Sequence, residues 1–290
     1  MYFLAGPLSF IIRPIYNIIE NYGLTLIIVT ILIRLLTIPL TLKSQKNMAK
    51  TQLIQPELAK LQERYKNDRE KLSIEMNRLY KQYDVNPMGG CLPLLIQMFI
   101  LFGFIGVIYH PFQYILQMSK DEISELAVAL GQTKTTQEMS LWGLEGVKEY
   151  IVNMGLKTIN FDFFGIDLTM TPSSHVREWT VWIFPVLATV ATYYSGVITK
   201  KQQNTSGQSS ANDQAQATSN MMTTMMPIMT AVFTFTMPIG MSLYWFVSTA
   251  VQLIQQVIMN KFVNEKMKEQ VSVKKQEILE KKEQRHHKKR

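Results

Sequence analysis

The sequence predicts an all-α, polytopic membrane protein with five transmembrane helices, and three observations support this fold class. Long stretches carry no charge, and the longest is the 47 residues between Asp213 and Lys261. About 20 apolar residues span one hydrocarbon core, so this stretch is long enough for two crossings. The charges gather instead in a few segments, one of which has the periodicity of amphipathic helices. A buried helix of a soluble domain is the alternative for each stretch, but five of them in 290 residues favour a membrane.

Five segments meet the length criterion for a span. They are 21–42, 87–110, 179–198, 221–239 and 240–261. The connections between them, and the two ends, are then 1–20, 43–86, 111–178, 199–220 and 262–290.

The distribution of lysine and arginine predicts which connections are cytoplasmic. Segment 43–86 carries ten basic residues, the short linker 199–220 carries two, and 261–290 carries eleven. Segment 113–178 has five basic and nine acidic residues, but at 66 residues it is too long to decide the orientation by itself. The short connections therefore place the N-terminus outside and the C-terminus inside, and an odd number of spans agrees with termini on opposite sides.

The first twenty residues predict an extracytoplasmic interfacial helix. They lack the basic start and small-residue cleavage pattern of a removed signal peptide. Their larger apolar residues fall on one helical face, which suits a helix lying in the membrane surface. These residues are Phe10, Ile11, Ile15, Ile18 and Ile19. A frayed N-terminal extension is the alternative.

Segment 43–86 has the pattern of two amphipathic helices joined by a turn at 66–70, with Pro56 in the first turn of the earlier helix. We expect a cytoplasmic helical hairpin whose apolar stripes need a partner, a membrane surface or a passing hydrophobic segment to cover them. A solvated connector is the alternative. The stripes consist of Leu53, Ile54, Leu58, Leu61, Tyr65, Leu72, Met76, Leu79, Tyr80 and Tyr83.

The last two connections are polar. Residues 205–219 are small, polar and aperiodic, which predicts a flexible linker. The tail from Lys261 has eleven basic and five acidic residues and ends RHHKKR. Such a tail attracts anionic lipid headgroups or the RNA of a ribosome in a salt-dependent manner. A solubilising end that also fixes the topology is the alternative.

Residues typical of catalytic sites are scarce. Cys91 is the only cysteine, and His110, His175 and the adjacent His286 and His287 do not have the spacing of a zinc site. No GxxxxGK[ST] loop occurs, and no carboxylate lies in a predicted span to carry protons. The sequence therefore argues against an enzyme, a bound cofactor or metal, and an ion-coupled pump.

Arg34 is the least expected residue of the predicted spans. It lies near the middle of the otherwise uncharged stretch Leu24–Leu42, where a guanidinium costs roughly 2.5 to 3.5 kcal/mol on insertion scales. This cost is tolerated where the side chain faces protein or a watered cavity. Thr30 lies one turn earlier on the same face, and Gln97 lies in the second span. We therefore expect a polar hollow inside the bilayer.

The last predicted span adds further polar groups. They are Tyr244, Trp245, Ser248, Gln252, Gln255 and Gln256. An interhelical hydrogen bond explains any one of these neutral groups. It does not explain Arg34, because no acidic residue of the spans can pair with it.

Three stretches resemble the YidC/Oxa/Alb family of membrane protein insertases. They are IRLLTIPLTLKSQK (33–46) followed by QPELAKLQERYKND (55–68), NPMGGCLPLLIQM (86–98), and MMPIMTAVFTFTMPIGMSLYWFVSTAVQLIQQ (225–256). They occur in order, and the chain resembles the short bacterial form that lacks a large extracytoplasmic domain. Phe99 stands where proline is common in the family, and the outer loop 113–178 is longer than usual.

The resemblance implies five helices around a hydrophilic groove that opens to the cytoplasm and the lipid and is closed on the outer side. Arg34 matches the groove arginine of the family, and Thr30, Gln97 and Trp245 match positions along the groove or the exit path. The hydrophobic slide along which a substrate leaves would contain Phe233, Met229 and Met226. Unbranched methionines repack readily against varied clients, although lipid-facing filler is an equal reading of them.

The implied function is that of an insertase and chaperone in the bacterial cytoplasmic membrane, acting without nucleotide hydrolysis. Its partners would be nascent membrane proteins, the lipid bilayer and a ribosome, with the Sec translocon as a further candidate. The competing class is an anion channel or solute transporter with Arg34 as the anion site. Such proteins often carry paired structural repeats, which the five unequal spans do not show. A purely structural scaffold leaves Arg34 without a purpose.

Overall fold

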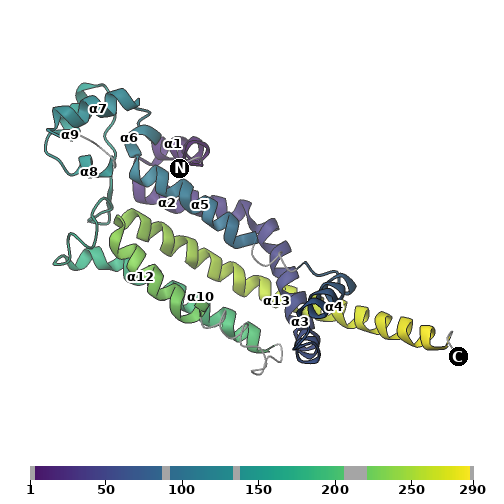
Figure 1. Cartoon of the computed structure of the whole chain (residues 1–290). Coiled ribbons are helices and arrows are strands. Elements are labelled where there is room, and N and C mark those ends of the chain that lie inside the picture. The colour runs from purple at the N-terminus through teal and green to yellow at the C-terminus, as the bar shows by residue number, and fades with distance from the viewer. Residues whose placement is uncertain (1–3, 87–91, 133–137, 206–220, 288–290) are drawn as a thin grey trace. The chain divides into compact units, whose positions relative to one another are not determined.

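The computed structural model describes residues 4–86, 92–132, 138–205 and 221–287, and most of them are helical (Figure 1). The prediction of an all-α protein is confirmed at this level. The exception within these residues is a small antiparallel hairpin of β1 (Asp162–Phe163) and β2 (Ile166–Asp167). The chain forms two compact units, which are described separately. Unit 1 consists of 1–36, 95–194 and 224–251, and unit 2 consists of 37–94, 195–223 and 252–290.

Unit 1 contains most of the helices. Its elements are α1 (Ala5–Ile19), α2 (Tyr22–Leu36), most of α5 (Leu92–Tyr109), α6 (Pro111–Tyr114), α7 (Lys120–Ala129), α8 (Met139–Trp142), α9 (Val147–Asn153), the β-hairpin, a 3₁₀ turn (Trp179–Trp182), the first half of α10 (Ile183–Thr205), α12 (Met226–Thr236) and the start of α13 (Ile239–His287). A π-helical turn, Met221–Met225, leads into α12. α5 continues through Phe99 without a break.

Four long helices with residues in unit 1, α2, α10, α12 and α13, have exposed apolar side chains and buried serines or threonines. On α12, Ile228 and Val232 are 57% and 61% exposed, whereas Thr230 and Thr234 are buried. Thr234 satisfies its hydroxyl by donating to the carbonyl oxygen of Thr230, 2.8 Å away. A surface helix of a soluble domain has the opposite arrangement, with its apolar stripe facing inward.

One described helical stretch, Trp179–Lys201, is long and apolar enough by itself to cross a membrane. A second exists if α2 and α3 (Ile38–Arg64) count as one broken span, and Leu95–Tyr109 of α5 is a shorter apolar helix. The break at Thr37 falls inside the predicted span 21–42. Pro39 lies in the first turn of α3, where its missing N–H needs no partner, so a new helix starts there readily. Five crossings stay a prediction.

The described residues of segment 111–178, expected as an outer loop, are folded and pack on α1 and α2. Trp142 lies between Phe112 and Phe161, at ring-centroid distances of 5.7 and 4.9 Å. Phe161 in turn meets the edge of Tyr22 at the start of α2. α6 lies against α1 (Figure 1). The segment therefore shares one hydrophobic core with the helices.

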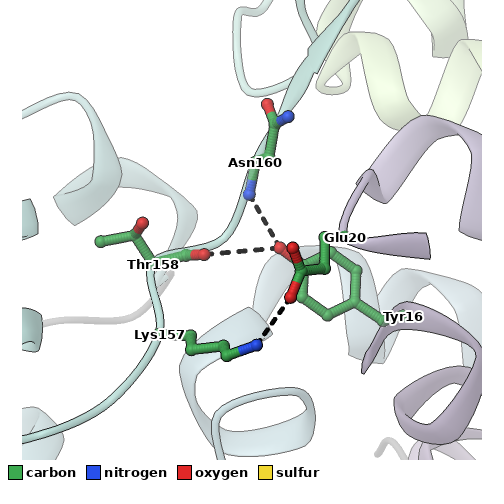
Figure 2. A network of polar contacts seen from close by, with 5 residues as sticks. All are labelled: Tyr16, Glu20, Lys157, Thr158 and Asn160. Carbon is green, nitrogen blue, oxygen red and sulfur yellow. Dashed lines mark hydrogen bonds and ion pairs between the residues drawn. The ribbon is translucent and has the colours of Figure 1, made fainter. Parts of the chain in front are cut away.

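Figure 2 shows how the end of α1 is joined to this segment. The Tyr16 hydroxyl accepts a 2.9 Å hydrogen bond from the backbone N–H of Asn160 and donates to the carbonyl oxygen of Thr158 at 3.5 Å. Lys157 Nζ lies 2.6 Å from Glu20 Oε1. The hydrogen bond and the charge of Lys157 lower the pKa of Glu20. Glu20 is exposed, and exposed ion pairs contribute little stability. We therefore infer that the hydrogen bonds of Tyr16, rather than the ion pair, hold the end of α1 against this segment.

Residues 160–173, the outer strap, join the start of α2 to the turn between α12 and α13. The N–H of Tyr22 donates to the carbonyl of Asn160 (2.9 Å), and the N–H of Gly240 donates to that of Leu168 (2.9 Å). Ile239 donates to Met170 in the same way. Backbone bonds of this kind hold both helix starts at the outer strap.

Unit 2 contains a helical hairpin of α3 and α4 (Arg69–Gln82), the end of α10 and the rest of α13. Asp68 caps α4 by accepting a hydrogen bond from the N–H of Lys71. The expectation that Pro56 occupies a first helical turn is wrong, because α3 begins at Ile38 and Pro56 lies inside it. α13 is one helix from Ile239 to His287, so it includes both the predicted span 240–261 and the described part of the tail. Most of the predicted flexible linker, 206–220, lies outside the described residues.

The substitution Gly23→Ala should destabilise unit 1. The added Cβ would lie 2.4 Å from Cδ2 of the Phe163 ring, which is itself buried. Overpacking of this kind costs about 1 to 3 kcal/mol, so we expect a lower midpoint of thermal unfolding in detergent, followed by circular dichroism. Gly6→Ala in α1 is the control, since nothing lies within 4 Å of its added Cβ. Equal midpoints for the two variants would contradict the close contact.

Candidate functional site

The site is built around Arg34, which lies in the last turn of α2. A cation at this end of a helix interacts favourably with the helix dipole. The side chain is half-buried, and its Nε donates a 3.1 Å hydrogen bond to Oγ of Ser248 in α13. Its Nη2 donates to the same oxygen. Ser248 is a neutral partner, so this contact satisfies N–H groups of the guanidinium without cancelling its charge.

Tyr244 and Gln97 extend this contact into a polar network. Tyr244 lies one turn before Ser248, so the two side chains lie on the same face of α13 beside Arg34. Gln97 of α5 donates from Nε2 to the Tyr244 hydroxyl at 3.1 Å. The Tyr244 ring stacks on Phe104 with a centroid distance of 4.1 Å, and both rings are buried. The network therefore draws on α2, α5 and α13, and its tyrosine is held by packing.

Two predicted groove residues lie outside these contacts. Thr30 is buried and donates its hydroxyl to the carbonyl oxygen of Leu26 in its own helix, 2.6 Å away. Trp245 donates from Nε1 to Oγ1 of Thr192 in α10, at 3.3 Å. Of the four predicted groove residues, the structure thus brings Arg34 and Gln97 into one network and gives Thr30 and Trp245 other partners.

The three predicted slide residues all lie on α12 but differ in exposure. Phe233 is half-buried against Trp245, with ring centroids 5.5 Å apart. Met229 is 61% exposed, and Met226 is partly buried. The predicted slide residues therefore include one exposed methionine, one partly buried methionine, and a phenylalanine that pairs with an aromatic residue of α13. The side chains of Met221 and Met222 lie outside the described residues.

Ser248 and Tyr244 are the network members that the sequence did not single out. Both occur among the polar groups of the last predicted span, and their spacing of four places them on one helical face. Thr192, the acceptor for Trp245, is one of several hydroxyl residues in α10, and nothing in the sequence distinguishes it from the others. Within the described residues, no group of His, Cys, Asp or Glu side chains is arranged to hold a metal ion.

Comparison with known proteins gives a consistent result. The model of the family described as 60Kd inner membrane protein matches residues 14–268. A membrane protein insertase YidC from Fusobacterium nucleatum is 31% identical over 254 residues, which are 88% of this chain and 93% of that protein.

Two other relatives are longer than this chain. The YidC insertase of Pelodictyon phaeoclathratiforme is 32% identical over 263 residues, 89% of this chain but 37% of that protein. That of Syntrophus aciditrophicus is 51% identical over 100 residues, 34% of this chain and 18% of the relative. The chain thus spans well under half of these two proteins and nearly all of the Fusobacterium relative.

Removing the Ser248 hydroxyl should destabilise unit 1 more than removing a serine hydroxyl elsewhere on α13. Ser248→Ala leaves N–H groups of a half-buried cation without this acceptor, and hydrogen bonds to charged groups contribute about 1.5 to 3 kcal/mol. The control is Ser242→Ala, which removes a neutral 3.3 Å bond to the carbonyl of Thr234. Ser248→Thr keeps the hydroxyl and should recover most of the loss. The measurement is thermal unfolding in detergent, and equal losses for the two alanine variants would count against the network.

Proposed function

Because the chain belongs to the YidC-type family of membrane protein insertases, we propose that it integrates nascent membrane proteins into the lipid bilayer through a hydrophilic groove containing Arg34. The proposed mechanism is physical and involves no covalent chemistry on the client. The residues of this chain lower the barrier that a polar segment meets when it enters hydrocarbon. No nucleotide is hydrolysed.

The contact between Arg34 and Ser248 is the observation that carries the proposal. The acceptor is a neutral hydroxyl, and the sequence places no carboxylate in the predicted spans. A guanidinium stays protonated in proteins, so a positive charge persists beside Tyr244 and Gln97. An acidic extracytoplasmic tail of a client gains attraction from this charge while it loses part of its hydration. The hydroxyl and amide groups offer it further hydrogen bonds.

The exposed faces of the helices support five crossings. Large apolar side chains are exposed along α2, α5, α10, α12 and α13, and serines or threonines are buried on four of these helices, all but α5. Helices in lipid commonly carry small hydroxyl residues at their contacts and apolar residues outside. The exposed residues are Leu24, Ile28, Ile31, Leu32, Leu35, Leu36, Leu95, Met98, Phe99, Phe102, Val186, Leu187, Val190, Tyr193, Tyr194, Val197, Ile228, Met229, Val232, Ile254, Val257 and Ile258.

A client leaves the groove along the slide formed by Phe233, Met229 and Met226. Burial of its own apolar span in lipid supplies the driving force, at about 25 cal/mol per Å² of apolar surface. Met229 is exposed and unbranched, so it can adapt to different client surfaces. Trp245 packs behind Phe233 and supports this wall.

We place the protein in the bacterial cytoplasmic membrane, with its N-terminus outside and its C-terminus inside. Segment 43–86 and the tail then face the cytoplasm, where the hairpin receives clients and the tail binds ribosomes. Segments 1–20 and 111–178 lie on the outer side. The Sec translocon is a candidate partner for clients that need both machines.

The charge of Arg34 is tested with single-span clients that differ only in their extracytoplasmic tails. With an acidic tail, Arg34→Ala should slow insertion by tenfold or more, whereas Arg34→Lys should retain part of the activity because it keeps the charge without the planar donor fork. With a neutral tail, all three proteins should differ little. Insertion is read as protease protection of the tail in reconstituted vesicles. Wild-type rates for Arg34→Ala with every client would refute the proposal.

Ribosome binding by the tail should depend on salt. Deletion of residues 266–290 removes ten of the thirty basic residues of the chain. Electrostatic binding to RNA weakens as counterion concentration rises. We expect cosedimentation with ribosomes at low salt, weakened both by the deletion and by raising the salt from about 50 to 200 mM. A deletion variant that cosediments like the full chain at both concentrations would show that the tail does not bind.

A further inference from the structure

Unit 2 contains a buried apolar cluster of the α3–α4 hairpin, which consists of Ile54, Leu58, Leu79, Tyr83 and Val85. The side of this cluster that α13 contacts is its apolar patch, which we call the hairpin surface. All five side chains are buried, and Met76 and Tyr80 pack at the edge of the patch. Val271 and Ile278 of α13 pack against it. The tail therefore supplies apolar side chains that cover the hairpin surface. The sequence alone did not show what covers it.

These two residues continue an apolar stripe along α13. Met259, Val263 and Met267 pack against Ala49 of α3, with further contacts from partly buried neighbours. Steps of four from Met259 to Val271, and of seven to Ile278, keep the stripe on one helical face. The tail helix is thus amphipathic, with an apolar face bordered by lysines.

Carboxylates form the rim of the hairpin surface. Lys275 Nζ lies 3.5 Å from Oε1 of Glu57, and Lys274 Nζ lies 3.1 Å from Oδ2 of Asp84. Glu57 also accepts a 2.8 Å hydrogen bond from the buried Tyr83 hydroxyl, which holds the carboxylate in place. The hydrogen bond and the charge of Asp84 raise the pKa of Lys274.

The backbone conformation of Asp84 suggests that the Asp84 carboxylate has a function. Asp84 follows the end of α4 with a φ of 52°, a left-handed conformation that usually selects glycine or asparagine. The N–H of the next residue, Val85, donates to the carbonyl of Tyr80 at 2.9 Å, as in a common helix-ending motif. The sequence thus carries a charged side chain at a position where glycine fits with less strain.

We infer that the hairpin surface, with its acidic rim of Glu57 and Asp84, recognises client segments in which apolar residues adjoin lysine or arginine, and that the tail helix occupies this surface until such a segment displaces it. This inference rests on the proposed function, since it names the part of a client that is bound. In this structure the tail occupies the site, and its apolar and lysine contacts indicate which kind of segment the site can bind.

Clients of an insertase carry segments of this composition. Cytoplasmic flanks of membrane spans are enriched in lysine and arginine, so a basic flank next to an apolar run is a general property of nascent membrane proteins. The apolar patch takes the start of the span, and the carboxylates take its flank. Exposed ion pairs add little affinity, so the rim selects among segments while the apolar contact holds them. The tail keeps the patch covered between clients, which protects it from non-specific association.

The contact in the absence of clients is tested first. A photoreactive benzophenone amino acid replaces Tyr80 in the purified full chain, and cross-links to 271–278 are located by mass spectrometry. The double variant Glu57→Gln, Asp84→Asn should lower the yield about two- to fivefold. The glutamine still accepts from Tyr83, and asparagine tolerates the left-handed backbone. Glu63→Gln with Glu70→Gln, exposed positions of the same hairpin, removes equal charge and should change nothing.

Competition is tested next, with two stalled nascent chains that share one apolar span and have either lysine or glutamate flanks. The lysine-flanked chain should cross-link to position 80 several-fold better and should reduce the tail cross-link. Neutralising the rim should abolish this difference. Lys274→Gln with Lys275→Gln should increase client cross-linking, whereas the matched pair Lys266→Gln with Lys268→Gln, both exposed, should not.

Equal cross-linking of the two nascent chains to the wild type, or a tail that does not cross-link to position 80, would overturn the inference. Insertion of the same clients is measured in parallel. Normal, Arg34-dependent insertion together with either negative result would leave the proposed function standing while removing this recognition site. Loss of Arg34 dependence with selective cross-linking intact would do the reverse.

Discussion

The rest of unit 1 depends on keeping one guanidinium charged and hydrogen-bonded among apolar helices. Arg34 meets this constraint through Ser248, whose small hydroxyl lets α13 present an oxygen without adding a second charge. A carboxylate in the place of Ser248 would form a buried ion pair, and such a pair would weaken the field on which the proposed attraction of acidic clients depends. The neutral hydroxyl of Ser248 does not cancel the charge of the guanidinium at this contact. Tyr244 and Gln97, which hydrogen-bond each other, add further neutral polar groups near the guanidinium.

The exposed surfaces follow from the same constraint. Several threonine hydroxyls that do not reach Arg34 donate to carbonyls of their own helices, as Thr30 does with Leu26 and Thr192 with Ala188. Such internal satisfaction lets polar residues lie at helix contacts, while the apolar residues face outward. An apolar exterior around a core that also buries hydroxyl groups is unfavourable in water and suited to lipid. The arrangement of side chains thus supports the membrane assignment where helix lengths alone identify one clear span.

Sequence patterns predicted those features that depend on one helix at a time. Arg34 stands out because its neighbours in the sequence are apolar. The helices α3 and α4 were predicted from the helical spacing of the apolar residues in segment 43–86. Features that depend on helix rotation could not be predicted this way: adjacent residues differ by about 100°, so nothing local decides between Tyr244 and Trp245 as the member of the network. In the tail, the many charged residues made the apolar stripe of α13 that ends at Ile278 hard to recognise in the sequence. Its apolar spacing has a meaning only beside the hairpin surface, which comes from another part of the chain.

The outer strap explains why Arg34 and Ser248 meet at all. Asn160 and Leu168 hold the starts of α2 and α13, and a backbone bond from Leu168 to Phe161 keeps the two anchor points adjacent. From these anchors, Arg34 lies twelve residues along α2 and Ser248 lies eight along α13, which at 1.5 Å per residue is about 18 and 12 Å. Helical side chains lean toward the N-terminus, and an extended arginine covers the remaining 6 Å or so. A strap without these bonds would let α2 slide along α13, and a shift of one turn would place the guanidinium beyond the reach of the hydroxyl.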